Sequence, residues 1–221
     1  TLGDMHKSGE WMTENLKKPF ELINDSEQKK SVNYLILGYL KKLRSESKDS
    51  DESSEDDVEP YEEIMKDLFL TFKSQTSLIF GNNKSKLEYL VDTVSKKAEV
   101  LGHNNPFRVH HGSLSKFERE CVEDELKSGK IISVFCSNTL EMGIDVGDIS
   151  IIGQIESPWS VSSLVQRLGR SGRRDGDISV MKLFISENET NENSTILDKI
   201  YNNLIQSIAL TELMIEKWIE P

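Results

Sequence analysis

The sequence lacks long apolar runs and contains only two cysteines and five prolines among its 221 residues. No apolar segment reaches the roughly 18 residues that a membrane-spanning helix needs. Cys121, Cys136 and the four histidines fall in no familiar zinc-site spacing, so we expect no metal site. Both cysteines have apolar neighbours, and we interpret them as buried free thiols in a reducing cytoplasm.

An excess of basic residues is also absent, since the formal net charge is −11. The segment from Ser45 to Glu63 alone contains ten acidic residues and one lysine. The acidity therefore comes from one tract and does not exclude a nucleic-acid-binding surface elsewhere. Within this tract, residues 45–58 (SESKDSDESSEDDV) are of low complexity, and we expect a mobile surface insertion. A partner-binding or phosphorylated segment is the alternative interpretation.

The sequence has no GxxxxGK(S/T) loop for binding nucleotide phosphates, because Gly129-Lys130 is followed by Ile131. The first residues, TLGD, lack an initiator Met and do not look like a signal peptide. We interpret the chain as a fragment. Apolar residues make up 36% of the sequence, which is enough for a buried core.

Apolar periodicity predicts strands that alternate with helices. The expected strands are 77–80, 107–109, 131–136, 151–155 and 179–185. Helices are expected over 64–72, 87–101 and 160–168, from Ser115 onward, and around a final apolar set at 197–208. Residues 31–40 fit either a strand or a helix, and we favour a strand. Strands that are apolar on both faces indicate a parallel sheet covered on both sides, with function at the loops after the strands' carboxyl ends.

The helix that starts at Ser115 has the clearest boundary signals. Glu118 follows three residues later and completes a capping-box signature, and Gly129 suits the position just after the helix. The residues expected on its buried face are Leu114, Phe117, Cys121, Val122 and Leu126.

Residues 166–174 (QRLGRSGRR) hold four arginines and two glycines. On a helix, Gln166, Arg170 and Arg173 would project from one side, and the glycines would permit a tight turn. Converging guanidinium groups suit polyanionic oxygen, either a γ-phosphate or a nucleic-acid backbone. From the spacing alone, a solvated basic turn is also possible.

This stretch resembles the QRxGRxGR motif of superfamily 2 helicases. Other motifs of that family's second RecA-like domain appear in order: SLIFGN at 77–82, HHGSLS at 110–115 and SNTLEMGIDV at 137–146. The SxxLExGID form, followed by Ser157-Pro158 and QRxGRxGR, is most similar to the large helicase-related (Lhr) branch of DEAD/DEAH-box-like enzymes.

The resemblance implies a fold and a domain organisation. The fold would be a RecA-like α/β three-layer sandwich of the P-loop NTPase type, with a mainly parallel sheet. Residues 1–25 would be the tail of the first motor domain and a connector, and residues 26–221 the second RecA-like domain. ATP with Mg²⁺ would be held mainly by the first domain, which is a partner of this one in the same chain.

For the nucleotide, the resemblance implies that Arg170 and Arg173 are arginine fingers. Such fingers stabilise charge in the phosphoryl-transfer transition state. Gln166 would contact the γ-phosphate region or the attacking water. Asp145 would bond the ribose, with Gly143 permitting close approach. Arg167 belongs to the same cofactor-binding group, although it is expected to pair with an acidic group inside the motor.

For the nucleic-acid strand, the resemblance implies contacts at three loops. The residues are Gly81, Asn82, Gly112, Ser113, Ser137 and Thr139, which offer backbone amides and short polar side chains to phosphates. His110 and His111 are expected to pack rather than to bind a metal, because the sequence places no Cys or carboxylate nearby.

We therefore expect a fragment of an ATP-dependent helicase that acts on DNA, as single strand or duplex. Two alternatives stay open: an RNA helicase, and a non-catalytic nucleic-acid-binding or partner-binding module on the same fold. The complete set of Gln166, Arg170 and Arg173 favours the motor.

Overall fold

A computed structural model describes residues 31–41, 62–141, 147–173, 177–192, 194–196 and 198–218. Its centre is a six-stranded sheet in the order β1-β6-β5-β2-β4-β3, and each pair of neighbouring strands is parallel. The strands are β1 Val32–Lys41, β2 Ser77–Gly81, β3 Phe107–His110, β4 Ser133–Cys136, β5 Ile151–Ile155 and β6 Ser179–Asn188. The parallel α/β sheet predicted from the sequence is thus confirmed, including the strand over residues 31–40.

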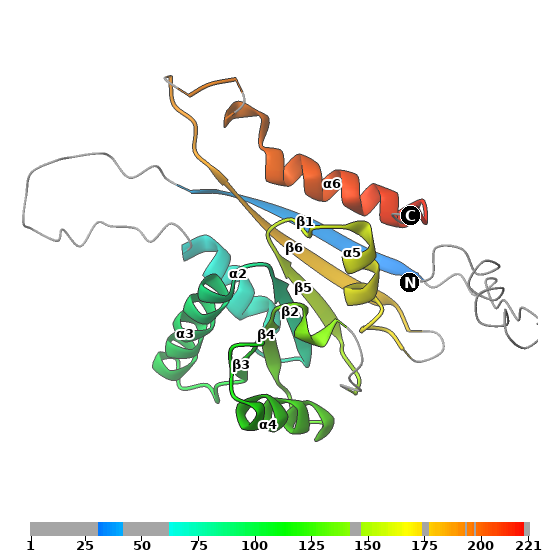
Figure 1. The fold of residues 1–221 in the computed structure, drawn as a ribbon. Coiled ribbons are helices and arrows are strands. Elements are labelled where there is room, and N and C mark those ends of the chain that lie inside the picture. Colours follow the sequence, from blue (N-terminus) through cyan, green and yellow to red (C-terminus); the bar gives the residue numbers. More distant parts are fainter. Residues whose placement is uncertain are drawn as a thin grey trace, which may run out of the picture.

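The helices are α2 Glu62–Phe72, α3 Lys84–Val100, α4 Lys116–Lys127, α5 Val161–Leu168 and α6 Asn202–Ile215, with short 3₁₀ turns at Asn138–Leu140 and Asp198–Ile200. Figure 1 shows α2 and α3 on one side of the sheet and α5 and α6 on the other. None of the helices in the described part of the chain is both long and apolar enough to span a membrane.

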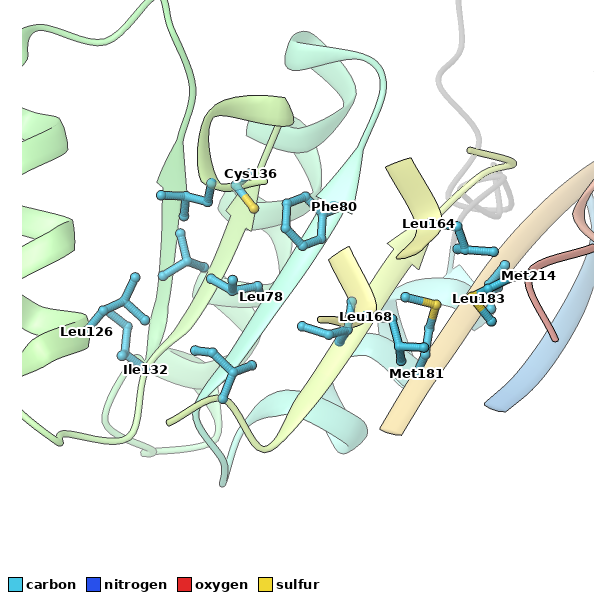
Figure 2. Packing of buried hydrophobic residues seen from close by; sticks show 14 of the residues in the cluster. Leu78, Phe80, Leu126, Ile132, Cys136, Leu164, Leu168, Met181, Leu183 and Met214 are labelled. Carbon is cyan, nitrogen blue, oxygen red and sulfur yellow. The ribbon is translucent and has the colours of Figure 1, made fainter. Parts of the chain in front are cut away.

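Two apolar clusters form the core, one on each face of the sheet. One cluster joins α2 and α3 to the sheet and includes Phe69, Phe72 and Leu90. The other joins α4, α5 and α6 to the opposite face and includes Leu126, Leu164 and Met214 (Figure 2). Strands in the middle of the sheet are therefore buried on both sides, which explains their continuous apolar sequences.

Gly153 in β5 permits close packing between the sheet and α2. A Cβ atom built at this position would lie 2.8 Å from Phe72 Cζ and 3.0 Å from Ile79 Cγ1. Real Cβ atoms do not make such contacts with ring carbons, so only glycine fits here without movement.

Helix α4 has the predicted ends but a narrower buried face. The Ser115 side chain accepts from the Glu118 backbone, and the Glu118 side chain accepts from the Ser115 backbone, which is a complete capping box. Gly129 follows the helix with φ of +74°, as expected for that position. Phe117 is 74% exposed and Cys121 is also exposed, so their expected burial is wrong. The short helix has only Val122 and Leu126 fully against the core.

Helix α6 also differs from the prediction, because it begins at Asn202 and continues to Ile215. Ser207 and Thr211 face the sheet and bond to carbonyl groups one turn earlier, whereas Ile205 and Ile208 are exposed. Small residues allow α6 to approach the sheet. Of the apolar residues in the predicted final helix, Leu204 packs against the core and Ile208 does not. Leu101, the last residue of the helix predicted over 87–101, is the C-cap of α3 and is exposed.

Several predicted features lie outside the described residues. These are residues 1–25, the acidic segment 45–58 and the two positions Gly143 and Asp145.

Candidate functional site

Six predicted strand-binding residues lie at the carboxyl ends of three adjacent strands. Strand β2 ends at Gly81 and is followed by Asn82. Strand β3 is followed by Gly112 and Ser113, and strand β4 by Ser137 and Thr139. Because β2, β4 and β3 are neighbours and parallel, these three loops meet at one edge of the sheet. The sequence-predicted residues are thus brought together from positions up to 58 apart.

Polar contacts join these loops to one another. The Asn82 side chain donates to the Ser157 carbonyl oxygen at 2.7 Å, which ties the β2 loop to the β5 loop. Lys84 Nζ donates to Ser113 Oγ at 2.8 Å, so a positive charge lies between the β2 and β3 loops. A Cβ atom on Gly81 would lie 2.8 Å from Leu87 Cδ2, so glycine lets α3 start directly behind β2.

Thr139 is joined to β3 through His110. Its hydroxyl lies 2.8 Å from His110 Nδ1 and 3.2 Å from the His110 carbonyl oxygen. On the other side of the ring, His110 Nε2 lies 3.1 Å from Glu123 Oε1 on α4. His110 is only 1% exposed.

His111 is equally buried and faces a different helix. Its Nδ1 accepts from the Ser113 backbone at 3.3 Å, and its Nε2 lies 2.8 Å from Glu88 Oε1 on α3 without hydrogen-bond geometry. The expectation that both histidines pack is confirmed, but the expectation that no carboxylate is near is wrong. The tertiary fold brings Glu88 and Glu123 to them from helices. No group of three His, Cys, Asp or Glu side chains in the described ranges could hold a metal ion.

Arg167 lies inside the domain, at the carboxyl end of α5. Its guanidinium donates to Glu141 Oε1 through Nε at 2.7 Å and also through Nη2, and Nη1 donates to the Gln154 side-chain oxygen. The guanidinium carbon is 5.1 Å from the centre of the Phe80 ring. The expected pairing of Arg167 with an acidic group is therefore present, and this side chain is only 2% exposed.

Arg170 contacts the same loop from outside. Its Nε donates to the Glu141 backbone oxygen at 3.1 Å, and Nη2 donates to the same atom. Burial, together with the charge of Arg173, lowers the pKa of Arg170. Glu141 is thus held by Arg167 at its side chain and by Arg170 at its backbone.

The arginine-rich stretch is only partly helical, which corrects the expectation that Gln166, Arg170 and Arg173 share one side of a helix. Helix α5 ends at Leu168, with Gly169 as its C-cap, so Arg170 and Arg173 come after it. The tight turn predicted from the glycines is present at Gly172, where φ is +58°. Gln166 is half-buried on the helix, and Arg173 is exposed.

These arginines also do not follow the carboxyl end of a strand. Ser171 forms a bridge with Ile149, just before β5 begins. The strand-binding loops therefore lie at the carboxyl edge of the sheet, whereas the Arg170 loop lies toward the amino end of β5.

Sequence reasoning assigned no role to Glu141 or Gln154, although both hold Arg167. Glu141 was part of the quoted 137–146 motif. Gln154 is a fully buried amide within the apolar strand IIGQI, and a polar side chain in such a run was a usable signal.

The helicase conserved C-terminal domain family matches residues 61–175. The Lhr helicase/probable uracil glycosylase from Mycolicibacterium smegmatis is 49% identical over 77 residues, which are 35% of this chain and 5% of that protein. An ATP-dependent helicase Lhr-Core from Saccharolobus solfataricus is 34% identical over 163 residues, which are 72% of this chain and 18% of that protein. The chain therefore spans less than a fifth of the length of these relatives.

Solved structures show the same fold. The Mycobacterium smegmatis helicase Lhr, bound to single-stranded DNA and AMP-PNP, matches with a TM-score of 0.65 and 28% identity over 86% of this chain and 22% of that chain. The helicase MrfA, bound to DNA and AMPPNP, matches with a TM-score of 0.60 and 21% identity over 92% of this chain and 26% of that chain. The family match covers more than half of the sequence and includes every motif loop described above. The chain belongs to the helicase conserved C-terminal domain family, in the Lhr branch of superfamily 2, and has its RecA-like fold.

Proposed function

We propose that this chain is the second motor domain of an ATP-dependent helicase that acts on DNA. The main support for the proposal is the set of hydrogen bonds around Glu141. Arg167 and Arg170 both donate to this residue, which connects the 137–141 loop to the arginine-rich stretch. A domain that only bound nucleic acid would not need this rigid support for a set of arginines. The names of relatives in the same family, which are ATP-dependent helicases, support the same activity.

In this proposal, residues 26–221 are the second RecA-like domain, and residues 1–25 come from the end of the first domain and the connector. The first domain holds most of the ATP molecule and its Mg²⁺ ion. This chain closes over the nucleotide when the two domains meet.

Arg170 and Arg173 act as arginine fingers toward the γ-phosphate, and Gln166 contacts the same region. An arginine guanidinium keeps its positive charge in proteins, so Arg170 can stabilise negative charge on the phosphoryl group. Arg167 acts indirectly by holding Glu141, and hence the loop that continues to Gly143 and Asp145. Those two residues are proposed to bind the ribose.

The loops after β2, β3 and β4 bind the phosphate backbone of the nucleic-acid strand. Ser113, Ser137 and Thr139 supply hydroxyl groups, and Lys84 adds a positive charge beside Ser113. Contacts to phosphates carry no sequence preference, which suits a protein that moves along a strand.

The test compares three variants of the full-length protein. Arg170→Ala should lower kcat for ATP by orders of magnitude and leave strand binding nearly intact. Arg170→Lys should fail similarly, because an ammonium group keeps the charge but not the planar fork. Thr139→Ala should instead weaken single-strand binding by about 1 kcal/mol, the scale of one hydrogen bond.

Fluorescence anisotropy on a labelled strand and a steady-state ATPase assay measure the two effects. Full ATPase activity in Arg170→Ala would contradict the finger role of Arg170, whereas strand binding without ATPase activity in the full-length wild type would favour a non-catalytic binding module. Strand affinity and ATPase activity measured with DNA and with RNA strands of the same sequence decide between a DNA helicase and an RNA helicase. The 221 residues alone, without a phosphate-binding loop, should hydrolyse no ATP.

A further inference from the structure

His110 connects a helix to a hydroxyl group of the proposed strand-binding edge. One ring nitrogen, Nε2, faces the Glu123 carboxylate at 3.1 Å, and the other, Nδ1, faces the Thr139 hydroxyl at 2.8 Å. The ring is 1% exposed, so water cannot replace either partner freely. The position of the protons in this chain of three groups is therefore decided by the groups themselves.

In the neutral ring, the carboxylate decides which nitrogen carries the proton. Glu123 can only accept, so Nε2 must be the N–H donor, and Nδ1 is then an acceptor. Thr139 has a single hydroxyl proton, for which Nδ1 at 2.8 Å is the nearer acceptor and the His110 carbonyl oxygen at 3.2 Å the other. Its oxygen would then present only lone pairs to a phosphate, which has no proton to give.

In the protonated ring, both nitrogens donate. Nε2–H still donates to Glu123, while Nδ1–H donates to Thr139 Oγ1. The Thr139 proton can then no longer be donated to Nδ1, and a phosphate oxygen can accept it in place of the His110 carbonyl oxygen, which lies 3.2 Å from the hydroxyl. Thr139 can therefore donate a hydrogen bond to a phosphate only when His110 has taken up one proton and is positively charged.

Neighbouring groups shift the pKa of His110 in both directions. Burial lowers its pKa, the charge of Arg119 on α4 acts in the same direction, and Glu123 opposes both. From β4, Cys136 pairs with His110 in the sheet, and burial raises the pKa of that thiol, which stays neutral. From α3, Glu88 faces the neighbouring His111. Without a bound strand, the ring is mainly neutral at pH 7.

We propose that His110 is a positioning residue, which turns the Thr139 hydroxyl toward a backbone phosphate and takes up a proton when the strand binds. This inference rests on the proposed function, since it needs a strand at the β4 loop. Uptake of a proton means that binding strengthens as pH falls. The gain is at most about tenfold in affinity per pH unit for one proton.

The experiment measures strand affinity of the full-length protein between pH 5.5 and 8.5, at constant ionic strength, by anisotropy. The wild type should bind more tightly at low pH. Thr139→Val keeps the size of the side chain but has no hydroxyl, and should lose this slope. Any dependence that comes from His111 and the Ser113 backbone would persist in Thr139→Val, so the difference between the two proteins isolates the His110 contribution.

A second variant leaves the buried ring in place. Glu123 is partly exposed, and Glu123→Gln keeps a hydrogen-bond acceptor while removing the charge that favours the imidazolium. Its affinity profile should shift to lower pH. Calorimetry of binding in two buffers of different ionisation enthalpy should show proton uptake in the wild type and less in Thr139→Val.

The outcomes separate the inference from the proposed function. If the wild type binds strand but Thr139→Val keeps the full pH slope and proton uptake, the His110 inference is overturned alone. An unchanged profile in Glu123→Gln would overturn it equally. If the wild type binds no strand at any pH, the proposed function fails and this inference with it.

Discussion

Arg167 and Glu141 form an ion pair inside the domain, with both side chains at most one-tenth exposed. Their positions in the sequence are 26 apart, and they belong to two different motifs, Glu141 in the loop after β4 and Arg167 on α5. Gln154 accepts from the same guanidinium, and Phe80 lies against it, so the charge is both paired and covered. The pair fixes the 137–141 loop against α5, from which the Arg170 loop continues.

Removal of this guanidinium should destabilise the domain strongly. Arg167→Met keeps much of the volume but leaves Glu141 and the Gln154 side-chain oxygen without their donor. Breaking a buried pair from one side typically costs about 3–5 kcal/mol. Urea unfolding of wild type and variant measures the loss. The double variant Arg167→Met with Glu141→Gln should recover part of it, and a loss below about 1 kcal/mol would contradict this account.

The charge of Lys84 should contribute to strand affinity. Lys84→Gln should weaken single-strand binding and make the dependence of log affinity on log salt shallower by about one unit or less. Lys96→Gln is the matched control, since it removes the same charge twelve residues further along α3, about 18 Å away. Anisotropy titrations at several salt concentrations measure both slopes. Equal effects of the two substitutions would show that Lys84 has no local role.

Any side chain at position 153 should destabilise the fold, because β5 and α2 pack closely there. Gly153→Ala should cost about 1–3 kcal/mol, because its Cβ would overlap with Phe72 and Ile79. Gly112→Ala is a suitable control for stability, since a Cβ there has nothing within 4 Å. Thermal unfolding of the two variants gives the comparison. A Gly153→Ala protein as stable as the Gly112→Ala protein would mean that the sheet and α2 separate easily.

The capping box of α4 should give stability that depends on pH. Hydrogen bonds with the Ser115 side chain and backbone lower the pKa of Glu118. A carboxylate with a lowered pKa stabilises the fold above its unfolded pKa and loses this effect as pH falls through the folded value. Glu118→Gln should therefore be less stable than the wild type at pH 7, and the difference should shrink toward pH 3.

Urea unfolding at pH 7, 5 and 3 tests the capping box. Ser115→Ala provides a second variant and should lose about 1 kcal/mol at pH 7, as other N-cap substitutions do. A constant difference between wild type and Glu118→Gln over this pH range would show that the carboxylate contributes nothing through its charge.

The local sequence determined the elements and the motif loops. Continuous apolar runs such as 151–155 indicated strands buried on both faces, and the fold has them in a parallel sheet. The two ends of α4 were predicted from Ser115, Glu118 and Gly129 to within about a residue, because capping depends on neighbours within one turn. The order of the motifs was sufficient to indicate the family.

Other features depended on contacts between distant parts of the chain. No spacing rule could bring Glu123 to His110, Glu88 to His111 or Glu141 to Arg167, because these pairs form only when helices pack on the sheet. The same packing decided that Ser207 faces inward on α6 while Ile208 faces solvent. Apolar periodicity reports which side of a helix can be buried, whereas the neighbouring surfaces decide which side is buried. The sequence by itself thus indicated which loops carry the proposed function. Which buried charged side chains hold those loops in place depended on the tertiary structure alone.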